Sequence, residues 1–300
     1  LVRLVAVRRF VLAWFGLIIV VILALALQAQ NLSGYYLENK PIAGGQFREG
    51  MVGTFTNANP LYAQNEVDRS VSRLVFGALF SYNVKGELVP DLAESYALDP
   101  TETIYTVKLK PGLKWHDGLP VTAKDVVFTY TSIQNPLTKS YLFSSWKGVT
   151  VTEVDDRTVN FKLANALSAF PQSLTTGIVP QHILATVEPS QLRSTDFNNQ
   201  RPVGTGPFSF QALEIERVAE RSMARVALRA NNNYHGGVPQ LDRFLILTYP
   251  DEASLLAAFK NNEVDSLVGL NSIPEGLNSQ QVVSHNIPLT SEVMVFFKHS

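Results

Sequence analysis

An uncharged apolar run near the amino end constrains this chain more than any other feature of its sequence. Phe10–Leu27 reads FVLAWFGLIIVVILALAL, and Arg3, Arg8 and Arg9 precede it. As a helix, this run is about 27 Å long, which matches the hydrocarbon core of a bilayer. Arginines on its amino side favour an amino terminus in the cytoplasm and a chain that continues outside. We therefore expect residues 1–30 to be a transmembrane anchor.

Two other interpretations of this run stay open. The letters ALALQAQ place small residues at the spacing of a signal-peptide cleavage site, although the apolar run is long for a signal peptide. A buried helix of a soluble domain is the third interpretation. The anchor and the signal peptide both export the rest of the chain, so we expect the remainder to work outside the cytoplasm.

The rest of the chain has the composition of an ordered protein without a nucleic-acid partner. Hydrophobic residues make up 46% of the sequence and charged residues 17%, which is typical of a folded chain. After residue 30, there are 22 basic and 26 acidic side chains, so no basic excess favours nucleic acid. The sequence contains no cysteine, which excludes disulfides, thiol catalysis, cysteine-based zinc sites and a lipidated cysteine.

After a polar tether at 31–45, the pattern is that of an α/β domain. We predict a strand at Gln46–Val52 and an asparagine-rich loop at Thr54–Gln64. Helical spacing of apolar residues follows from Val67 to Ala78. Two β-rich runs within Val149–Leu163 predict a hairpin around Asp155–Asp156.

The stretch KLKPGLKWHDGLPVTAKDVVFTY combines several local signals. Its first three residues are the end of the alternating strand Ile104–Lys110. Asp117–Gly118 then predicts a tight turn before Leu119 and Pro120. Thr122–Asp125 has the form of a capping box, with Asp in place of the usual Glu. A helix should follow, and its inward-facing residues are expected to be Val126, Val127, Tyr130 and Ile133.

The later part of the chain predicts a strand pair, another strand and a new unit. The strand pair begins at Pro202 with PVGTGPFSF and returns through ARVALRAN. Leu241–Tyr249 is a further apolar strand, and Asp251 then caps a helix that precedes another strand. We interpret this change as the start of a fresh α/β unit near residue 250.

The sequence offers little that indicates catalysis or metal binding. None of the five histidines has the i, i+4 spacing or neighbouring ligands of a helical metal site. His116–Asp117 could be a catalytic base and its orienting acid, but the turn chemistry around it favours a structural role. Gly204–Gly206 lacks the spacing of phosphate-binding loops and instead indicates a tight crossing of two backbones.

Candidate ligand-binding residues fall into three groups. The polar loop contributes Thr56, Asn57 and Asn59, which could serve a ligand or simply form turns. The aromatic residues Tyr62, Trp146 and Tyr249 could line a cleft, although core positions are the simpler interpretation. The backbone crossing contributes Gly204, Thr205 and Gly206.

Six segments in register give the chain a family resemblance. They include LYAQNEVDRSVSRLVFGALF, GELVPDLAESY, YTVKLKPGLKWHDGLPVTAKDVVFTY, VTVTEVDDRTVNFKL, PVGTGPFSF and NNNYHGGVPQLDRFLILTYPDEASLLAAFKNNEVD. Together they span about residues 50–270, and the chain resembles the family 5 solute-binding proteins of ABC importers. That family comprises oligopeptide-, dipeptide- and nickel-binding proteins.

The resemblance implies a bilobed α/β fold of the class II periplasmic-binding-protein type. It places lobe I at 46–249, with an inserted subdomain at about 80–195, and the start of lobe II at 250–300. Hinge strands would cross near Tyr249–Asp251. Relatives are longer, so the resemblance implies that this chain is a fragment and that the rest of lobe II follows residue 300.

The resemblance also implies the function that we expect. The protein would be a monomeric binding component outside the cytoplasmic membrane, without cofactor, metal or catalysis, that delivers peptides to ABC permease subunits. Alternatives are the same fold with a nickel chelate, a saccharide or haem as ligand. From other classes, the alternatives are an exported hydrolase that uses His116–Asp117 and an orphan sensor or adhesion domain.

Overall fold

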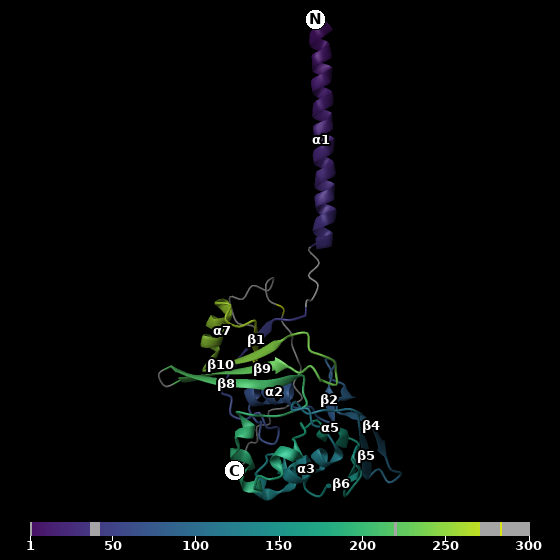
Figure 1. The fold of residues 1–300 in the computed structure, drawn as a ribbon, viewed down its shortest axis with the longest axis vertical. Helices are drawn as coiled ribbons and strands as arrows, with labels where there is room; N and C mark the ends of the chain where they lie inside the picture. The colour runs from purple at the N-terminus through teal and green to yellow at the C-terminus, as the bar shows by residue number, and fades with distance from the viewer. Residues whose placement is uncertain (1, 37–42, 219–220, 271–282, 284–300) are drawn as a thin grey trace, which may run out of the picture. The chain divides into compact units, whose positions relative to one another are not determined.

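The computed structural model describes residues 2–36, 43–218, 221–270 and 283. The chain divides into two units, Leu1–Ala43 and Gly44–Ser300. In the first unit, α1 (Val2–Tyr36) is one continuous helix (Figure 1). Its segment Phe10–Ala29 is long and apolar enough to cross a membrane, a property that signal sequences share. The anchor and the signal peptide therefore both stay compatible with the structure.

The predicted tether at 31–45 is partly helical. Helix α1 continues through Tyr36, since no proline interrupts it before Pro41. Residues 37–42 of the predicted tether lie outside the described residues.

The second unit is built on a five-stranded mixed sheet. Its order is β11-β1-β10-β9-β8, and the strands are β11 (Ser266–Val268), β1 (Gln46–Val52), β10 (Arg243–Tyr249), β9 (Arg221–Ala230) and β8 (Phe208–Val218). Strand β1 pairs in parallel with both β10 and β11, whereas β10, β9 and β8 are joined by antiparallel pairing. Strands β10 and β11 run in the same direction on either side of β1, and the crossover between them contains α7 (Glu252–Lys260).

Helices cover both faces of this sheet (Figure 1). Helix α2 (Glu66–Val75) buries Val67, Val71 and Val75 in the main core, together with residues of β1, β9 and β10. On the other face, α7 packs over the sheet in a smaller core of Tyr249, Leu255, Ala258 and Val264. Each helix therefore covers one side of strands whose side chains alternate between the two faces.

A second layer of structure occupies the range predicted for the inserted subdomain. It has a four-stranded antiparallel sheet in the order β4 (Ala93–Leu98), β5 (Ile104–Leu109), β7 (Thr158–Lys162), β6 (Thr150–Asp155), and a small pair β2 (Phe80–Tyr82) and β3 (Leu88–Pro90). Helix α3 (Ala123–Gln134) packs on β6 and β7. Short helical segments complete it: η1 (Pro136–Thr138), α4 (Phe143–Trp146), α5 (Phe170–Ser173), α6 (Gln181–Leu184), η2 (Pro189–Ser194) and η3 (Asp196–Asn198). One continuous apolar core joins this layer to the five-stranded sheet.

The local predictions in this layer are confirmed. Helix α3 begins at the predicted box, because the backbone N–H of Thr122 donates to Asp125 Oδ2 at 2.9 Å. Val126, Tyr130 and Ile133 are fully buried, and Val127 packs against the core while partly exposed. These features depend on contacts within one or two turns of chain, which is why the sequence reveals them.

The structure differs from the prediction that a separate α/β unit begins near residue 250. Helix α7 and β11 return to the same sheet, where Gly50 of β1 lies opposite Leu267 of β11. Strand β1 would otherwise leave one edge unpaired, and β11 fills part of that edge. Of the predicted start of lobe II at 250–300, residues 271–300 lie outside the described residues except for residue 283.

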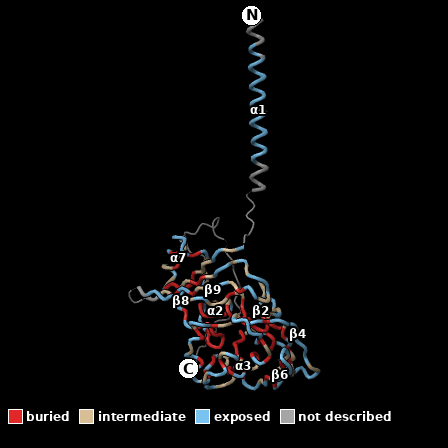
Figure 2. The backbone as a smooth tube through the Cα atoms, in the orientation of Figure 1, coloured by how far each residue is buried: buried red, intermediate tan, exposed pale blue. Residues whose placement is uncertain are grey.

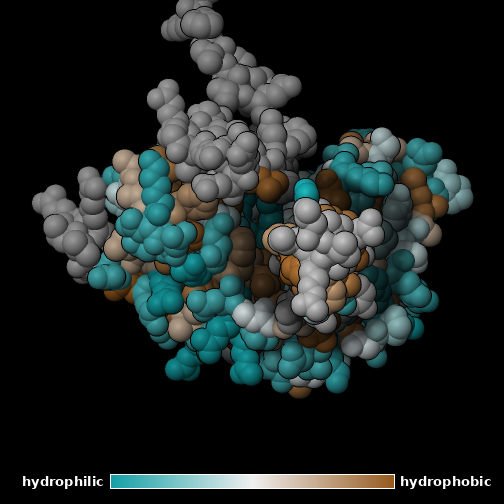
Figure 3. Space-filling view, turned by 90° about the horizontal axis from the view of Figure 1, so that it is seen from above, coloured by the Kyte–Doolittle hydropathy of each residue, from teal (hydrophilic) through white to brown (hydrophobic). Residues whose placement is uncertain are grey.

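Burial follows this architecture. Buried residues concentrate between the five-stranded sheet and the subdomain, while the outer edges of both are exposed (Figure 2). On the face seen in Figure 3, hydrophilic residues predominate and apolar residues show in small groups. The ends of the strands, rather than a large apolar patch, are therefore the place to expect a site on this unit.

Candidate functional site at the carboxyl edge of the parallel strands

The carboxyl ends of the three parallel strands meet at one edge of the sheet. Val52, Tyr249 and Val268 are the last residues of β1, β10 and β11. The backbone N–H of Gly53 donates to the Tyr249 carbonyl oxygen at 2.9 Å, which keeps the two strand ends together. Open α/β sheets bind ligands at this end of their strands, so this edge is the candidate site.

The loop that follows β1 is held at this edge by a buried carboxylate. Asp68, in the first turn of α2, is only 2% exposed. It accepts hydrogen bonds from the backbone N–H groups of Thr56 (2.7 Å) and Asn57 (3.0 Å) and from Thr56 Oγ1 (2.6 Å). Its own backbone N–H donates to Asn65 Oδ1, the N-cap of α2. The loop is thus fixed to a helix start instead of being free to rearrange.

The two asparagines of the loop are used inside the protein. Asn57 Oδ1 accepts from the backbone N–H of Asn59, and Asn59 Oδ1 accepts from that of Leu61. The side-chain amide of Asn59 donates to Asn198 Oδ1 at 3.0 Å. Their amide oxygens therefore stabilise the shape of the loop. Thr54 and Thr56 remain exposed at the edge, so they are the loop side chains that a ligand could reach.

The crossing at Gly204–Gly206 secures the other end of α2. The backbone N–H of Gly206 donates to the Val75 carbonyl oxygen at 2.8 Å, and Thr205 Oγ1 accepts from the backbone N–H of Gly77. A Cβ on Gly204 would lie 1.9 Å from the Val75 oxygen. The predicted tight backbone crossing is confirmed, and glycine is required because the two backbones touch.

His116 bridges this crossing. Its Nδ1 accepts from the backbone N–H of Gly204 at 3.2 Å, and its Nε2 lies 3.1 Å from the Gly206 carbonyl oxygen. This pattern fits the neutral ring with its proton on Nε2. Burial lowers the pKa of His116, and this effect outweighs the bond to Gly206 and the charge of Asp117, which raise it. Asp117 instead bonds to His182 Nε2 at 2.8 Å, so His116 and Asp117 do not form a catalytic pair.

The buried state of His116 predicts an acid-sensitive stability. Because its folded-state pKa lies below the usual value of about 6.5, the unfolded chain binds a proton first as pH falls. Stability is therefore full above about pH 6.5 and declines below it, with a slope of up to about 1.4 kcal/mol per pH unit from this group. In His116→Gln, we expect a shallower slope between pH 7 and pH 5, measured by urea unfolding. An unchanged slope would contradict this role.

Comparison with known proteins places the chain in a family. The model described as "Bacterial extracellular solute-binding proteins, family 5 Middle" matches residues 87–300. The chain belongs to family 5 of the solute-binding proteins. The matched residues cover most of the second unit. The match confirms the predicted fold class, an α/β lobe of a bilobed binding protein.

Individual family 5 relatives support this assignment. A Brucella ovis protein named for peptide binding by an ABC transporter is 34% identical over 250 residues, which is 80% of this chain and 45% of the relative. The solved oligopeptide-binding protein AppA of Bacillus subtilis, in complex with a nonapeptide, is 31% identical with a TM-score of 0.68 and covers 75% of this chain and 44% of its own. The chain thus spans about half the length of the relatives that it matches.

Another family 5 structure shows that ligands differ within the fold. NikZ from Campylobacter jejuni, in complex with Ni(L-His), is 26% identical with a TM-score of 0.65 and covers 74% of this chain and 43% of its own. No group of three or more His, Cys, Asp or Glu suited to a metal occurs among the described residues of this chain. The likeness to family 5 therefore identifies the fold and leaves the ligand to be tested.

The structure brings only part of the predicted site together. Thr56, Asn57 and Asn59 lie in the loop after β1, and Tyr249 ends β10 at the same edge but is buried under α7. Tyr62 is buried, donates to the Thr138 carbonyl oxygen at 3.0 Å and lies beneath the Arg193 guanidinium. Burial raises the pKa of Tyr62 to about 12, so its hydroxyl stays protonated.

Trp146 lies apart from the other predicted residues. It is 2% exposed and packs against Tyr130, Phe161 and Phe170 in the core of the subdomain. Aromatic rings in this arrangement stabilise a core through buried area and edge-to-face contacts. No element carries Trp146 to the carboxyl edge of the parallel strands.

Sequence reasoning missed Asp68 and Asn198. The signal for Asp68 is present in Asn65–Asp68, which reads NEVD and has the form of a capped helix start. Its further bonds to Thr56 and Asn57 depend on the path of the loop, which that pattern does not specify. Asn198, whose carbonyl oxygen accepts from Ala58 at 2.6 Å, is far away in sequence and gives no local signal.

Proposed function

We propose that this chain is part of the extracytoplasmic binding component of an ABC importer and that it binds peptides at the carboxyl edge of β10, β1 and β11. The observation that carries the proposal is the convergence of three parallel strand ends and a fixed polar loop, in a chain of family 5. The described chain also leaves the sheet from β11 at this edge, so a following lobe would face it. The ligand would lie between that lobe and this edge.

A peptide suits the chemistry of this edge. The loop after β1 presents the small exposed side chains of Thr54 and Thr56, which suit contact with an extended peptide irrespective of the peptide's own side chains. The side chains of Asn57, Asn59 and Tyr62 act indirectly in this proposal, because they hold the loop. Among the predicted site residues, Thr56 is the one that we propose as a direct ligand contact, and Tyr249 supports the edge from beneath α7.

The transport role follows from the same proposal. Helix α1 would hold the protein at the outer face of the cytoplasmic membrane, and permease subunits would receive the ligand. We propose a monomer without catalysis. Both ring nitrogens of His116 are engaged with backbone groups and Asp117 is bonded to His182, so neither is arranged for acid–base chemistry on a ligand.

A calorimetric titration of the full-length protein tests the proposed ligand. We expect heat with a pool of peptides of three to nine residues and none with a mixture of nickel and histidine. Thr54→Trp should weaken peptide binding at least tenfold, because the indole would occupy the exposed edge. Thr150→Trp is the matched control, since Thr150 is also exposed but lies on β6 of the subdomain.

The outcomes of this titration separate the alternatives. Heat with nickel and histidine alone would replace peptides by a chelate as the ligand. If Thr54→Trp and Thr150→Trp bound peptides with equal affinity, the carboxyl edge would be excluded as the site. No heat with either ligand in a folded protein would overturn the proposed ligand class.

A further inference from the structure

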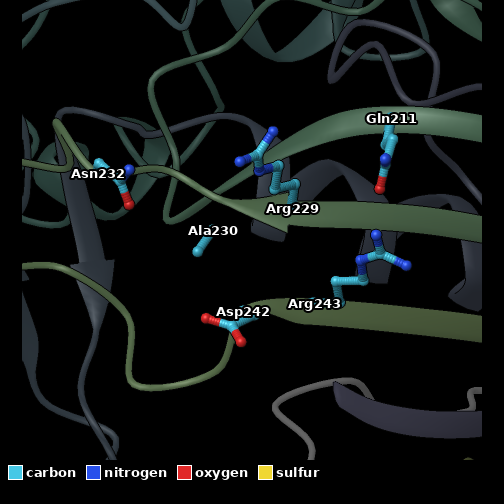
Figure 4. A pocket seen from close by; sticks show the side chains of 6 residues that line it. All are labelled: Gln211, Arg229, Ala230, Asn232, Asp242 and Arg243. Carbon is cyan, nitrogen blue, oxygen red and sulfur yellow. The ribbon is translucent and has the colours of Figure 1, made fainter. Parts of the chain in front are cut away.

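A polar hollow lies on the sheet at the end opposite to the candidate site. It has a volume of about 390 Å³ and is lined by Gln211, Arg229, Ala230, Asn232, Asp242 and Arg243 (Figure 4). Arg243 is the first residue of β10, and Gln46, the first residue of β1, is its partner in the sheet. The hollow is therefore at the amino end of the parallel strands, away from their carboxyl edge.

Two arginines occupy paired positions of neighbouring strands beside this hollow. Arg229 of β9 and Arg243 of β10 are directly paired in the antiparallel register, and both are exposed. Like charges at facing positions destabilise a sheet, because their side chains stand on the same face at short range. Figure 4 shows both guanidinium groups on the side of the strands where Gln211 of β8 also lies.

Other arginines on the same face have acidic partners. Arg48 Nη2 lies 2.7 Å from Asp265, and Arg225 Nη1 lies 3.7 Å from Glu214. Arg229 and Arg243 form no ion pair with any described residue. The nearby Asp242 points away from them in Figure 4, and its Oδ2 accepts from the backbone N–H of Gly45 at 3.1 Å. Within the described residues, neighbouring arginines thus have acidic partners and this pair has none.

We propose that Arg229, Arg243 and Gln211 form a binding site for a phosphate group. Each guanidinium presents a planar fork of donors that matches the oxygens of a phosphate group. A phosphate can engage two forks at once with its oxygens, and the amides of Gln211 and Asn232 add donors at the rim. A dianion would also remove the repulsion between the facing arginines.

The phosphate could belong to a phospholipid or be free in solution. The phospholipid source rests on the proposed function, because it requires α1 to anchor the protein in a membrane. The candidate span and the hollow belong to one chain, so anchoring would raise the effective concentration of headgroups for the second unit. The free phosphate source requires no anchor.

The test compares three full-length proteins: wild type, the double variant Arg229→Gln/Arg243→Gln, and Arg225→Gln. The last is the matched control, since Arg225 lies on the same strand and face but pairs with Glu214. In detergent, each protein is titrated with inorganic phosphate by calorimetry and thermal unfolding. In nanodiscs, hydrogen exchange of β9 and β10 is compared between phosphatidylglycerol and phosphatidylcholine.

If the source is free phosphate, we expect the phosphate affinity of the double variant to fall at least tenfold. If the source is the lipid, we expect the double variant to lose the protection of β9 and β10 by phosphatidylglycerol. Arg225→Gln should behave as wild type in both arms. Loss in the first arm identifies free phosphate as a source, and loss in the second alone identifies the lipid. Without phosphate, the double variant should also unfold at a higher temperature than wild type. Equal behaviour of wild type and double variant in both arms, or equal loss in Arg225→Gln, would overturn the site.

Peptide titration of the same samples separates this proposal from the proposed function. The hollow and the carboxyl edge are at opposite ends of the strands, so the double variant should bind peptides as wild type does. Phosphate binding without peptide binding would leave this site intact and contradict the proposed ligand. Peptide binding together with no effect of the arginine substitutions in either arm would contradict the phosphate site and leave the proposed ligand intact.

Discussion

Replacing Gly204 with alanine is expected to prevent this unit from folding stably. A Cβ at this position would lie 1.9 Å from the carbonyl oxygen of Val75 and 2.7 Å from its carbonyl carbon. Both are backbone atoms at the end of α2, so no side-chain rotation can relieve the overlap. Overpacking of a core costs about 1–3 kcal/mol, and we expect a loss at or above the upper end here because backbone must move.

The measurement is urea unfolding of Gly204→Ala beside wild type, with soluble yield as a second readout. Gly118→Ala is the matched control. Gly118 has a φ of +91° in the turn after Trp115, but nothing lies within 4 Å of its Cβ position, so alanine there meets only conformational strain. That strain is about 1–2 kcal/mol. If Gly204→Ala were no more destabilised than Gly118→Ala, the close crossing would not exist as described.

The second large effect is expected at Asp68. Asp68→Ala removes the acceptor of two backbone N–H groups and of the Thr56 hydroxyl, and the Asp68 side chain that is lost is buried. Hydrogen bonds to charged groups contribute about 1.5–3 kcal/mol, and buried donors left without acceptors add a further cost. We expect a loss of about 3 kcal/mol or more in the free energy of unfolding.

The same substitution should weaken the proposed peptide binding, because the loop that Asp68 fixes carries Thr54 and Thr56. Asp99→Ala is the matched control, because it also removes a carboxylate that accepts local hydrogen bonds. Asp99 accepts from the backbone N–H groups of Thr103 and Ile104, but it is partly exposed, so water can replace it more readily than at Asp68. Chemical unfolding and calorimetry on both variants would test this. Equal losses of stability in the two variants would contradict the special role of the buried site.

Much of the fold was predictable because its signals are local. The capping pair Thr122 and Asp125 is separated by three residues, and the turn at Asp117–Gly118 closes within Trp115–Leu119. The hairpin of β6 and β7 likewise needs only two short β-rich runs around one turn. Such contacts form between residues that are neighbours in any conformation of the chain, so residue type and spacing suffice.

The boundary near residue 250 was wrong for the opposite reason. Strand β11 pairs with β1, and Arg48 binds Asp265 across 217 positions of sequence. A helix followed by a strand reads the same whether it extends an existing sheet or begins a new one. The free edge of β1 decides between these outcomes, and no local pattern near residue 250 records that edge.

The candidate site also combines features that local sequence predicts with features that depend on distant contacts. By itself, the sequence determined the polar loop after β1, the glycine crossing and the family, since each depends on residue types in a fixed order. Only the tertiary structure decided that Asn57 and Asn59 face inward, that Asp68 and Asn198 hold them, and that Trp146 lies elsewhere. The physical reason is that a buried polar side chain takes its role from whichever partner the fold brings within about 3 Å, however distant that partner is in the chain.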